Sequence, residues 1–339
     1  MTNVAPLGAD KCTTSRPDDK ANLLPEIALL FEEMSARHGK DVDCTLMSSE
    51  KGRARAALQN RKWNTDLPAE ILSRDVTIDS RGHPEGREVS GTLFIPPNPR
   101  PGVTLYAHGG GFAFGSPACQ SRFTSLLAQY TGQVVLSLDY QLAPEAPFPA
   151  GLHDVVAALR FLSSNQDKLG LQSGPVSIAG ESAGANLAIS ALIYEIRAGR
   201  PARVAGALLI CGNYQHNPDT ASAKAFYNGP GLTIPRMARY WSWYAPEGKE
   251  NDPTLFPLSA CDDELLQLPP LAIYAAGIDP LLTDSTMLFE RCVALKHPVT
   301  LEVVPHVLHG FIQMSRDVPE VQCVIQRMAA AVLDWTFCS

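Results

Sequence analysis

The sequence predicts an α/β protein in which a mainly parallel central sheet is flanked by helices. From residue 102 onward, short apolar runs alternate with longer segments that have the apolar spacing of helices. Such alternation is typical of parallel strands that are covered by helices on both faces. Before it, residues 70–79 and 88–97 predict two strands joined by a turn, and we expect this pair to be antiparallel. One long segment, residues 214–257, interrupts the alternation.

The remaining elements follow one another in a regular order. Strands are expected at residues 102–109, 133–140, 175–180, 204–212, 268–277 and 298–304. Helices are expected between them at residues 118–132, 151–170, 182–199 and 281–297, and a last helix is expected after Pro319. Two more helices, at residues 23–34 and 48–63, precede every strand.

The N-terminal helices and the long interruption together predict a cap. A connection longer than about 15 residues inside a compact domain is usually functional or has structure of its own, and this one is rich in bulky aromatic residues. We expect residues 1–65 to form an N-terminal helical cap segment and residues 214–245 to form a cap insertion. Residues 66–213 and 246–339 would then form the core, with the cap over the C-terminal edge of the sheet.

Composition and charge exclude several classes of function. The chain has 339 residues, 45% of them hydrophobic, and a formal net charge of −7 without a long basic run. Nucleic acids and anionic membrane surfaces need clustered lysine and arginine, so neither is an expected partner. No segment approaches the roughly 18 apolar residues of a membrane span. The first 20 residues lack the apolar core of a signal peptide, so a soluble, cytoplasmic protein is expected.

The eight cysteines do not predict a metal site. None of them forms a C-x-x-C pair, and their spacing matches no zinc-binding pattern. In a cytoplasmic chain we expect them to remain thiols. Neither a metal nor an organic cofactor is therefore expected.

Ser182 is the candidate nucleophile. It lies in the sequence GESAG, between the strand that ends near Gly180 and the helix that begins near Ala183. This strand–turn–helix context is the one that a G-x-S-x-G nucleophile elbow requires. Gly180 and Gly184 suit such a bend, because it brings backbone and helix too close for side chains. The motif alone occurs in many proteins, so it indicates a nucleophile only if a base and an acid accompany it.

A serine hydroxyl needs a base to remove its proton, and the base needs a third group to orient it. Three histidines follow Ser182 late in the chain. His297 precedes a proline in a turn, where we expect it to face solvent. His309 lies a few residues beyond the last predicted strand, where a loop can carry the imidazole over the sheet. His306 is three residues away, and spacing alone does not exclude it.

Asp279 is the best candidate for the orienting acid. It directly follows the strand predicted at residues 268–277, so its carboxylate projects from the C-terminal end of that strand. Asp284 is already inside the next helix, where we expect a solvated or capping residue. The acidic run at residues 262–264 is expected to begin a helix.

The glycine-rich sequence AHGGGFAFG supplies candidate donors for an oxyanion. His108 ends a strand, and Gly109, Gly110 and Gly111 can present backbone N–H groups to the site together with the N–H of Ala183. Such donors are worth several kcal/mol of barrier lowering in acyl-transfer enzymes. A phosphate-binding loop is the alternative, but neither G-x-G-x-x-G spacing nor a P-loop lysine accompanies these glycines.

With these residues in place, the chain resembles the hormone-sensitive-lipase family of α/β-hydrolases, and most closely its bacterial acetyl esterase and carboxylesterase branch. The motifs that carry the resemblance are HGGGF at 108–112, DYQLAPEAPFPA at 139–150, GESAG at 180–184, DPL at 279–281 and HGF at 309–311. The resemblance implies an α/β-hydrolase fold from about residue 70 to the C-terminus. It also implies a triad and an oxyanion hole, formed by Ser182, Asp279 and His309, and by Gly109, Gly110 and Ala183.

Three positions depart from the family pattern. Glu181 precedes the serine where members often have aspartate, Gln141 stands where arginine is common, and His306 stands where glycine is frequent. None of these changes removes a residue of the implied triad. The N-terminal 65 residues and the long interruption match the family only loosely, so the preferred substrate stays open.

The resemblance implies a serine carboxylesterase that hydrolyses short- to medium-chain acyl esters through a covalent acyl-enzyme. An amidase or formamidase with the same triad is the alternative enzyme. A catalytically inactive ligand-binding receptor is a third reading, but such receptors lose the catalytic histidine. The expected partner is a small-molecule ester, not a nucleic acid or a membrane, and a homodimer is a possible assembly.

Overall fold

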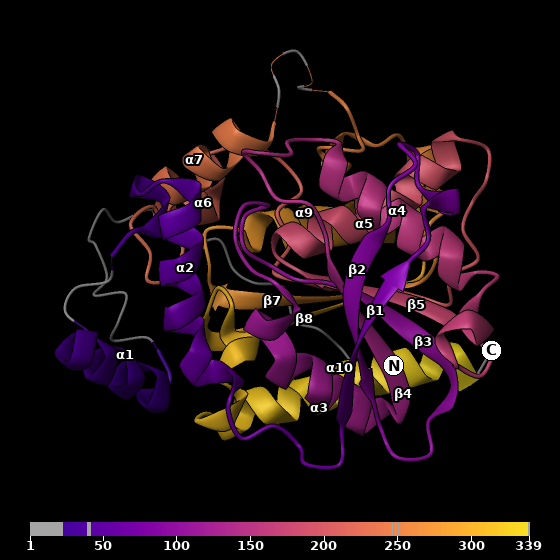
Figure 1. Ribbon diagram of the computed structural model, residues 1–339. Coiled ribbons are helices and arrows are strands. Elements are labelled where there is room, and N and C mark those ends of the chain that lie inside the picture. Colours follow the sequence, from indigo (N-terminus) through magenta and orange to yellow (C-terminus); the bar gives the residue numbers. More distant parts are fainter. Residues whose placement is uncertain (1–22, 39–41, 246, 248, 250, 338–339) are drawn as a thin grey trace, which may run out of the picture.

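A single eight-stranded sheet forms the centre of the protein (Figure 1). The computed structural model describes residues 23–38, 42–245, 247, 249 and 251–337. The strands lie in the order β1-β2-β4-β3-β5-β6-β7-β8. Their bounds are β1 Leu72–Ile78, β2 Val89–Ile95, β3 Arg100–Ala107, β4 Gln133–Asp139, β5 Val176–Glu181, β6 Ala207–Ile210, β7 Leu271–Ile278 and β8 Val299–Leu308.

Most of the sheet is parallel, as the sequence predicts. β2 runs antiparallel to both of its neighbours, β1 and β4, and all other neighbouring strands pair in parallel. The expected antiparallel pair at the start of the sheet is therefore confirmed. The parallel strands from β3 to β7 are almost entirely buried, because helices cover both of their faces.

Helices form the two outer layers. Their bounds are α1 Pro25–His38, α2 Ser49–Asn60, α3 Ser121–Thr131, α4 Ala150–Leu162, α5 Ala183–Arg197, α6 Ala221–Ala225, α7 Ile234–Tyr244, α8 Asp262–Leu266, α9 Leu282–Ala294 and α10 Pro319–Phe337. In Figure 1, α3 and α10 lie below the strands, while α4, α5 and α9 lie above them. Each layer buries its own apolar cluster against one face of the sheet. Among the described residues, no helix combines the length and the apolar character that a membrane span requires.

The N-terminal segment packs against the insertion between β6 and β7. The carboxylate of Asp43 forms ion pairs with Arg236 and Arg239 of α7, and Arg239 also donates to the hydroxyl of Thr45. Residues 1–22 of the expected N-terminal cap segment lie outside the described residues. Within the described part, the two segments that the sequence assigns to a cap are thus in direct contact.

Two buried side chains fix the ends of this insertion. Asn186, in the first turn of α5, donates through its amide nitrogen to the carbonyls of Asn213 and Leu255, at 2.8 and 3.0 Å. Asp284 in α9 accepts hydrogen bonds from the backbone N–H groups of Tyr214 and Gln215. Asp284 is 2% exposed, so the expectation that it is a solvated or capping residue is wrong. Its carboxylate is instead hydrogen-bonded to the first residues of the insertion.

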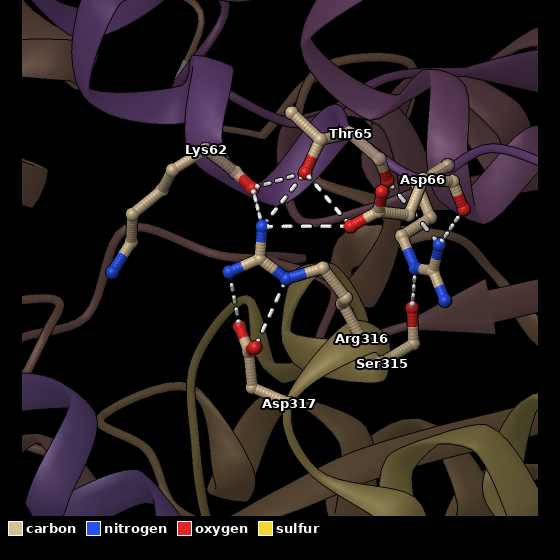
Figure 2. A network of polar contacts seen from close by, with 7 residues as sticks. Lys62, Thr65, Asp66, Ser315, Arg316 and Asp317 are labelled. Atoms are coloured by element: carbon tan, nitrogen blue, oxygen red, sulfur yellow. Dashed lines mark hydrogen bonds and ion pairs between the residues drawn. The ribbon is translucent and has the colours of Figure 1, made fainter.

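The segment that follows β8 is held by a polar network (Figure 2). Arg316, which ends the 3₁₀ helix Phe311–Arg316, donates to the carbonyl of Lys62 at 2.9 Å and to the hydroxyl of Thr65 at 2.7 Å. It also pairs with the carboxylate of Asp317. Figure 2 shows Arg316 between the N-terminal segment and the C-terminal part of the chain. The loop between β8 and α10 is therefore tied to the N-terminal segment.

Candidate active site

Ser182 lies at a sharp bend between β5 and α5. Its backbone has φ 55° and ψ −117°, a strained conformation for a residue with a side chain. A Cβ atom on Gly180 would lie 2.2 Å from the carbonyl oxygen of Gly184, and one on Gly184 would lie 2.0 Å from that of Ala107. Only glycine fits at these two positions, so the spacing of the GESAG motif follows from the tightness of the bend.

The structure brings the three residues of the expected triad together. Nε2 of His309 is 2.9 Å from Oγ of Ser182, and Nδ1 of His309 is 2.8 Å from Oδ2 of Asp279. The other carboxylate oxygen of Asp279 accepts the N–H of Leu281 at 2.8 Å. An ionised carboxylate can only accept, so Nδ1 carries the proton and Nε2 is free to accept the hydroxyl proton of Ser182.

The three residues meet because they follow three parallel strands. Ser182 follows β5, Asp279 follows β7, and His309 follows β8 directly, and the carboxyl ends of parallel strands lie at one edge of a sheet. β8 reaches Leu308, four residues beyond its expected end at residue 304. His309 therefore lies at a strand end rather than in a long loop.

The other two candidate histidines lie elsewhere. His306 is part of β8, has φ 60° and is exposed, and its carbonyl accepts the N–H of Leu24 at 2.9 Å. His297 is 6% exposed, and its Nε2 lies 3.0 Å from the carbonyl of Pro269. The expectation that His297 faces solvent is wrong, because the ring turns inward to this carbonyl.

The charges around His309 favour its protonated form. Burial by itself would lower the pKa of His309, but the Asp279 carboxylate and its hydrogen bond, together with Glu181, raise that pKa above its ordinary value. A histidine with a raised pKa is a stronger base. The same charges stabilise an imidazolium that forms when the proton of Ser182 moves to His309.

Glu181 is a feature of the site that sequence analysis did not single out as functional. It is 3% exposed, and its Oε1 lies 3.9 Å from Nε2 of His309. Its Oε2 accepts the side-chain N–H of Gln120 at 2.9 Å. Burial raises the pKa of Glu181, as does the charge of Asp279, while His309 and Gln120 act in the opposite direction. The only signal in the sequence was glutamate in a position where related chains often have aspartate.

The glycine loop after β3 offers N–H groups beside Ser182. The N–H of Gly109 donates to Oε1 of Gln120 at 3.3 Å, so it is already occupied. The N–H groups of Gly110, Gly111 and Ala183 have no acceptor within the described part of the chain. This differs from the expectation that Gly109, Gly110 and Ala183 form the hole. The geometry favours Gly111 in place of Gly109.

The buried side chain of His108 packs beneath the glycine loop and contacts its backbone. Its ring is fully buried and stacks on Tyr140 with the centroids 4.3 Å apart. Burial lowers the pKa of His108 to about 4, although its contact with the carbonyl of Gly109 acts in the opposite direction. A neutral ring then donates from Nδ1 to that carbonyl, which is 2.9 Å away. His108 therefore supports the backbone of the loop at Gly109.

The insertion between β6 and β7 contacts both sides of Ser182. A Cβ atom on Gly111 would lie 2.3 Å from the ring of Tyr240 in α7. The ring of Phe112 stacks on Tyr244 with 3.7 Å between centroids. At the other side, a Cβ atom on Gly231 would lie 2.9 Å from Leu308, the residue before His309. Ser182 itself is 6% exposed, so access to it is narrow.

Comparison with known proteins places this geometry in a family. A family model described as an alpha/beta hydrolase fold matches residues 104–313. The acetyl esterase of Salmonella typhi is 31% identical over 264 residues, which cover 76% of this chain and 79% of that relative. A crystal structure of a thermostable esterase from Pseudomonas putida ECU1011 is 22% identical with a TM-score of 0.86, and the match covers 93% of this chain and 98% of that chain.

A second solved structure adds to this comparison. An ester hydrolase from the metagenome of Lake Arreo, in complex with a bipyridine phosphonate derivative, is 27% identical with a TM-score of 0.83. The match covers 91% of this chain and 98% of that chain. From the family model and the relative from Salmonella typhi, we conclude that this chain belongs to the α/β-hydrolase family, as its motifs predicted.

Proposed function

We propose that the protein is a serine carboxylesterase in which Ser182 is the nucleophile, His309 the general base and Asp279 the residue that orients it. One observation carries the proposal: the unbroken chain of contacts from Ser182 through His309 to Asp279, at 2.9 and 2.8 Å. The names of the relatives, acetyl esterase and esterase, support the same class of reaction.

The mechanism is a two-step acyl transfer. Nε2 of His309 takes the hydroxyl proton while Oγ of Ser182 attacks the ester carbonyl, and Asp279 stabilises the imidazolium. The N–H groups of Gly110, Gly111 and Ala183 receive the charge of the oxyanion. His309 then gives its proton to the departing alcohol. Water, activated by the same nitrogen, hydrolyses the acyl-enzyme and restores Ser182.

We further propose that the N-terminal segment and residues 214–245 act as a cap that limits the acyl chain. Tyr240 packs against the glycine loop and Gly231 against Leu308 at the end of β8, next to His309, which supports a small, mostly apolar pocket. Each methylene group that fits in such a pocket contributes about 0.8 kcal/mol through its burial. Beyond the end of the pocket this gain stops, so short acyl chains of about two to six carbons should be preferred.

The test is a panel of p-nitrophenyl esters of increasing acyl length, with the matching anilides measured beside them. We expect kcat/KM to be highest for short esters and to fall steeply by about ten carbons. Faster hydrolysis of the anilides would favour the amidase alternative. Activity that keeps rising with acyl length would contradict the cap, and no turnover of any ester would contradict the proposed function.

A further inference from the structure

Cys211 lies beside the candidate triad. Its sulfur, a carboxylate oxygen of Asp279 and a ring nitrogen of His309 all lie within 4.8 Å of one another. Cys211 follows the end of β6, between the strands that lead to Ser182 and to Asp279. The three residues are far apart in the sequence, and the shared edge of the parallel strands brings them together.

The backbone of Cys211 is held by its neighbours, and its side chain is buried. The residue is 1% exposed, has φ 47°, and its N–H donates to the carbonyl of Tyr274 at 2.8 Å. Burial raises the pKa of the Cys211 thiol well above its ordinary value, and the charges of Asp279 and Glu181 raise it further. Hydrogen bonds from the backbone N–H groups of Ala276 and Gly310 lower this pKa, but by less. Without a cation, the group is therefore a protonated thiol and not a nucleophile.

These three donors match the ligand preferences of one class of ion. Zn²⁺ and Cd²⁺ favour thiolate, imidazole and carboxylate ligands in tetrahedral sites. With bonds of about 2.0–2.3 Å, such ligands lie roughly 3.5 Å apart. Nδ1 of His309 and Oδ2 of Asp279, now 2.8 Å apart, must therefore separate by about 0.7 Å, and the sulfur of Cys211, within 4.8 Å of both side chains, must approach by up to about 1 Å. A thiolate and a carboxylate together balance the charge of a divalent cation, and the fourth position is left for water.

We propose that Cys211, Asp279 and His309 form an inhibitory site for a thiophilic divalent cation such as Zn²⁺ or Cd²⁺. The cation enters between Oδ2 of Asp279 and Nδ1 of His309 and binds the sulfur of Cys211. The thiol proton is released to solvent, and the imidazole proton moves from Nδ1 to Nε2. No electrons are transferred, and removal of the ion reverses each step.

An ion bound at this site stops ester hydrolysis. With a proton on Nε2, His309 cannot accept the hydroxyl proton of Ser182, so the base is lost. This consequence rests on the proposed function, whereas the binding of the ion does not. The proposed mechanism uses no metal, so a chelator alone should leave the rate of ester hydrolysis by the metal-free enzyme unchanged.

The experiment titrates the metal-free protein with Cd²⁺ and measures ester hydrolysis in wild type, Cys211→Ser and Cys292→Ser. Cys292 is the matched control, because it is also a fully buried thiol but lies in α9 outside the cluster. Each rate is expressed relative to the same variant without Cd²⁺. We expect inhibition of wild type and Cys292→Ser that EDTA reverses, and a half-inhibiting concentration at least about tenfold higher in Cys211→Ser.

A second readout does not depend on activity. The ultraviolet charge-transfer absorbance of the Cd²⁺–thiolate bond should be lower by one equivalent in Cys211→Ser and in Cys211→Ala than in wild type. This band still decides the question if a variant, or the wild type, hydrolyses no ester. Equal Cd²⁺ sensitivity of wild type and Cys211→Ser, or an unchanged band in both Cys211 variants, would overturn the proposal.

Discussion

Replacement of Gly111 by alanine tests the proposed oxyanion hole at the point where the glycine loop meets α7. Gly111 has φ 60°, and an added Cβ would lie 2.3 Å from the ring of Tyr240. The backbone conformation alone costs an alanine about 1–2 kcal/mol. The clash must in addition move the loop or α7, which displaces the N–H that we assign to the oxyanion. Loss of one such donor costs about 3–4 kcal/mol of transition-state stabilisation, or a fall of about 10²- to 10³-fold in kcat.

Gly132→Ala is the matched control for this change. Gly132 caps the C-terminal end of α3 with φ 66°, and an added Cβ would meet only the flexible side chain of Arg100, at 3.4 Å. Thermal unfolding should therefore detect a loss of stability in both variants, larger in Gly111→Ala because of the added clash with Tyr240, while the kinetics of p-nitrophenyl acetate hydrolysis should change only in Gly111→Ala. Adding Tyr240→Ala to Gly111→Ala should recover part of kcat, because the ring that causes the clash is gone. If Gly111→Ala keeps wild-type kcat/KM, the assignment of this donor is refuted.

Two further predictions concern the base. His309→Ala should lower kcat/KM by about 10⁴- to 10⁶-fold, since triad residues act as a unit. His306→Ala should keep most of the activity in the same assay. The opposite ranking of the two variants would identify His306 as the base. Glu181→Gln should shift the acidic limb of the pH profile of kcat/KM to lower pH. Glu181 helps to raise the pKa of His309, so without its charge His309 stays neutral, and active as a base, down to lower pH. The surface change Glu290→Gln should leave the profile in place, and a Glu181→Gln profile that matches wild type would contradict this electrostatic role.

Local sequence pattern was sufficient to predict the fold. The buried strands β5 and β7 consist of apolar runs that are too short for helices, and glycine and proline mark their ends. The amphipathic spacing of the segments between them identified the covering helices. The candidate triad could be placed for the same reason: Ser182 and Asp279 each directly follow such a run, and the order of residues along the chain matches the family.

Specific side-chain partners could not be predicted. The N–H of Gly109 is occupied by Gln120, which lies only 11 residues further along the chain but belongs to no motif that announces this contact. Asp284 is buried because it accepts the N–H groups of Tyr214 and Gln215, some 70 residues earlier. Cys211 shows no metal-binding spacing in the sequence, since its neighbours Asp279 and His309 are brought to it only by the sheet.

The most direct test of the account is to label the protein with a fluorophosphonate and to locate the adduct by mass spectrometry. We expect one adduct, on Ser182, because a fluorophosphonate reacts only with a serine whose proton is removed by a neighbouring base. In Ser182→Ala the adduct should be absent, and kcat/KM for p-nitrophenyl acetate should fall by about 10⁴- to 10⁶-fold with the fold intact. An adduct on another residue, or hydrolysis that persists at the wild-type rate in Ser182→Ala, would contradict the account.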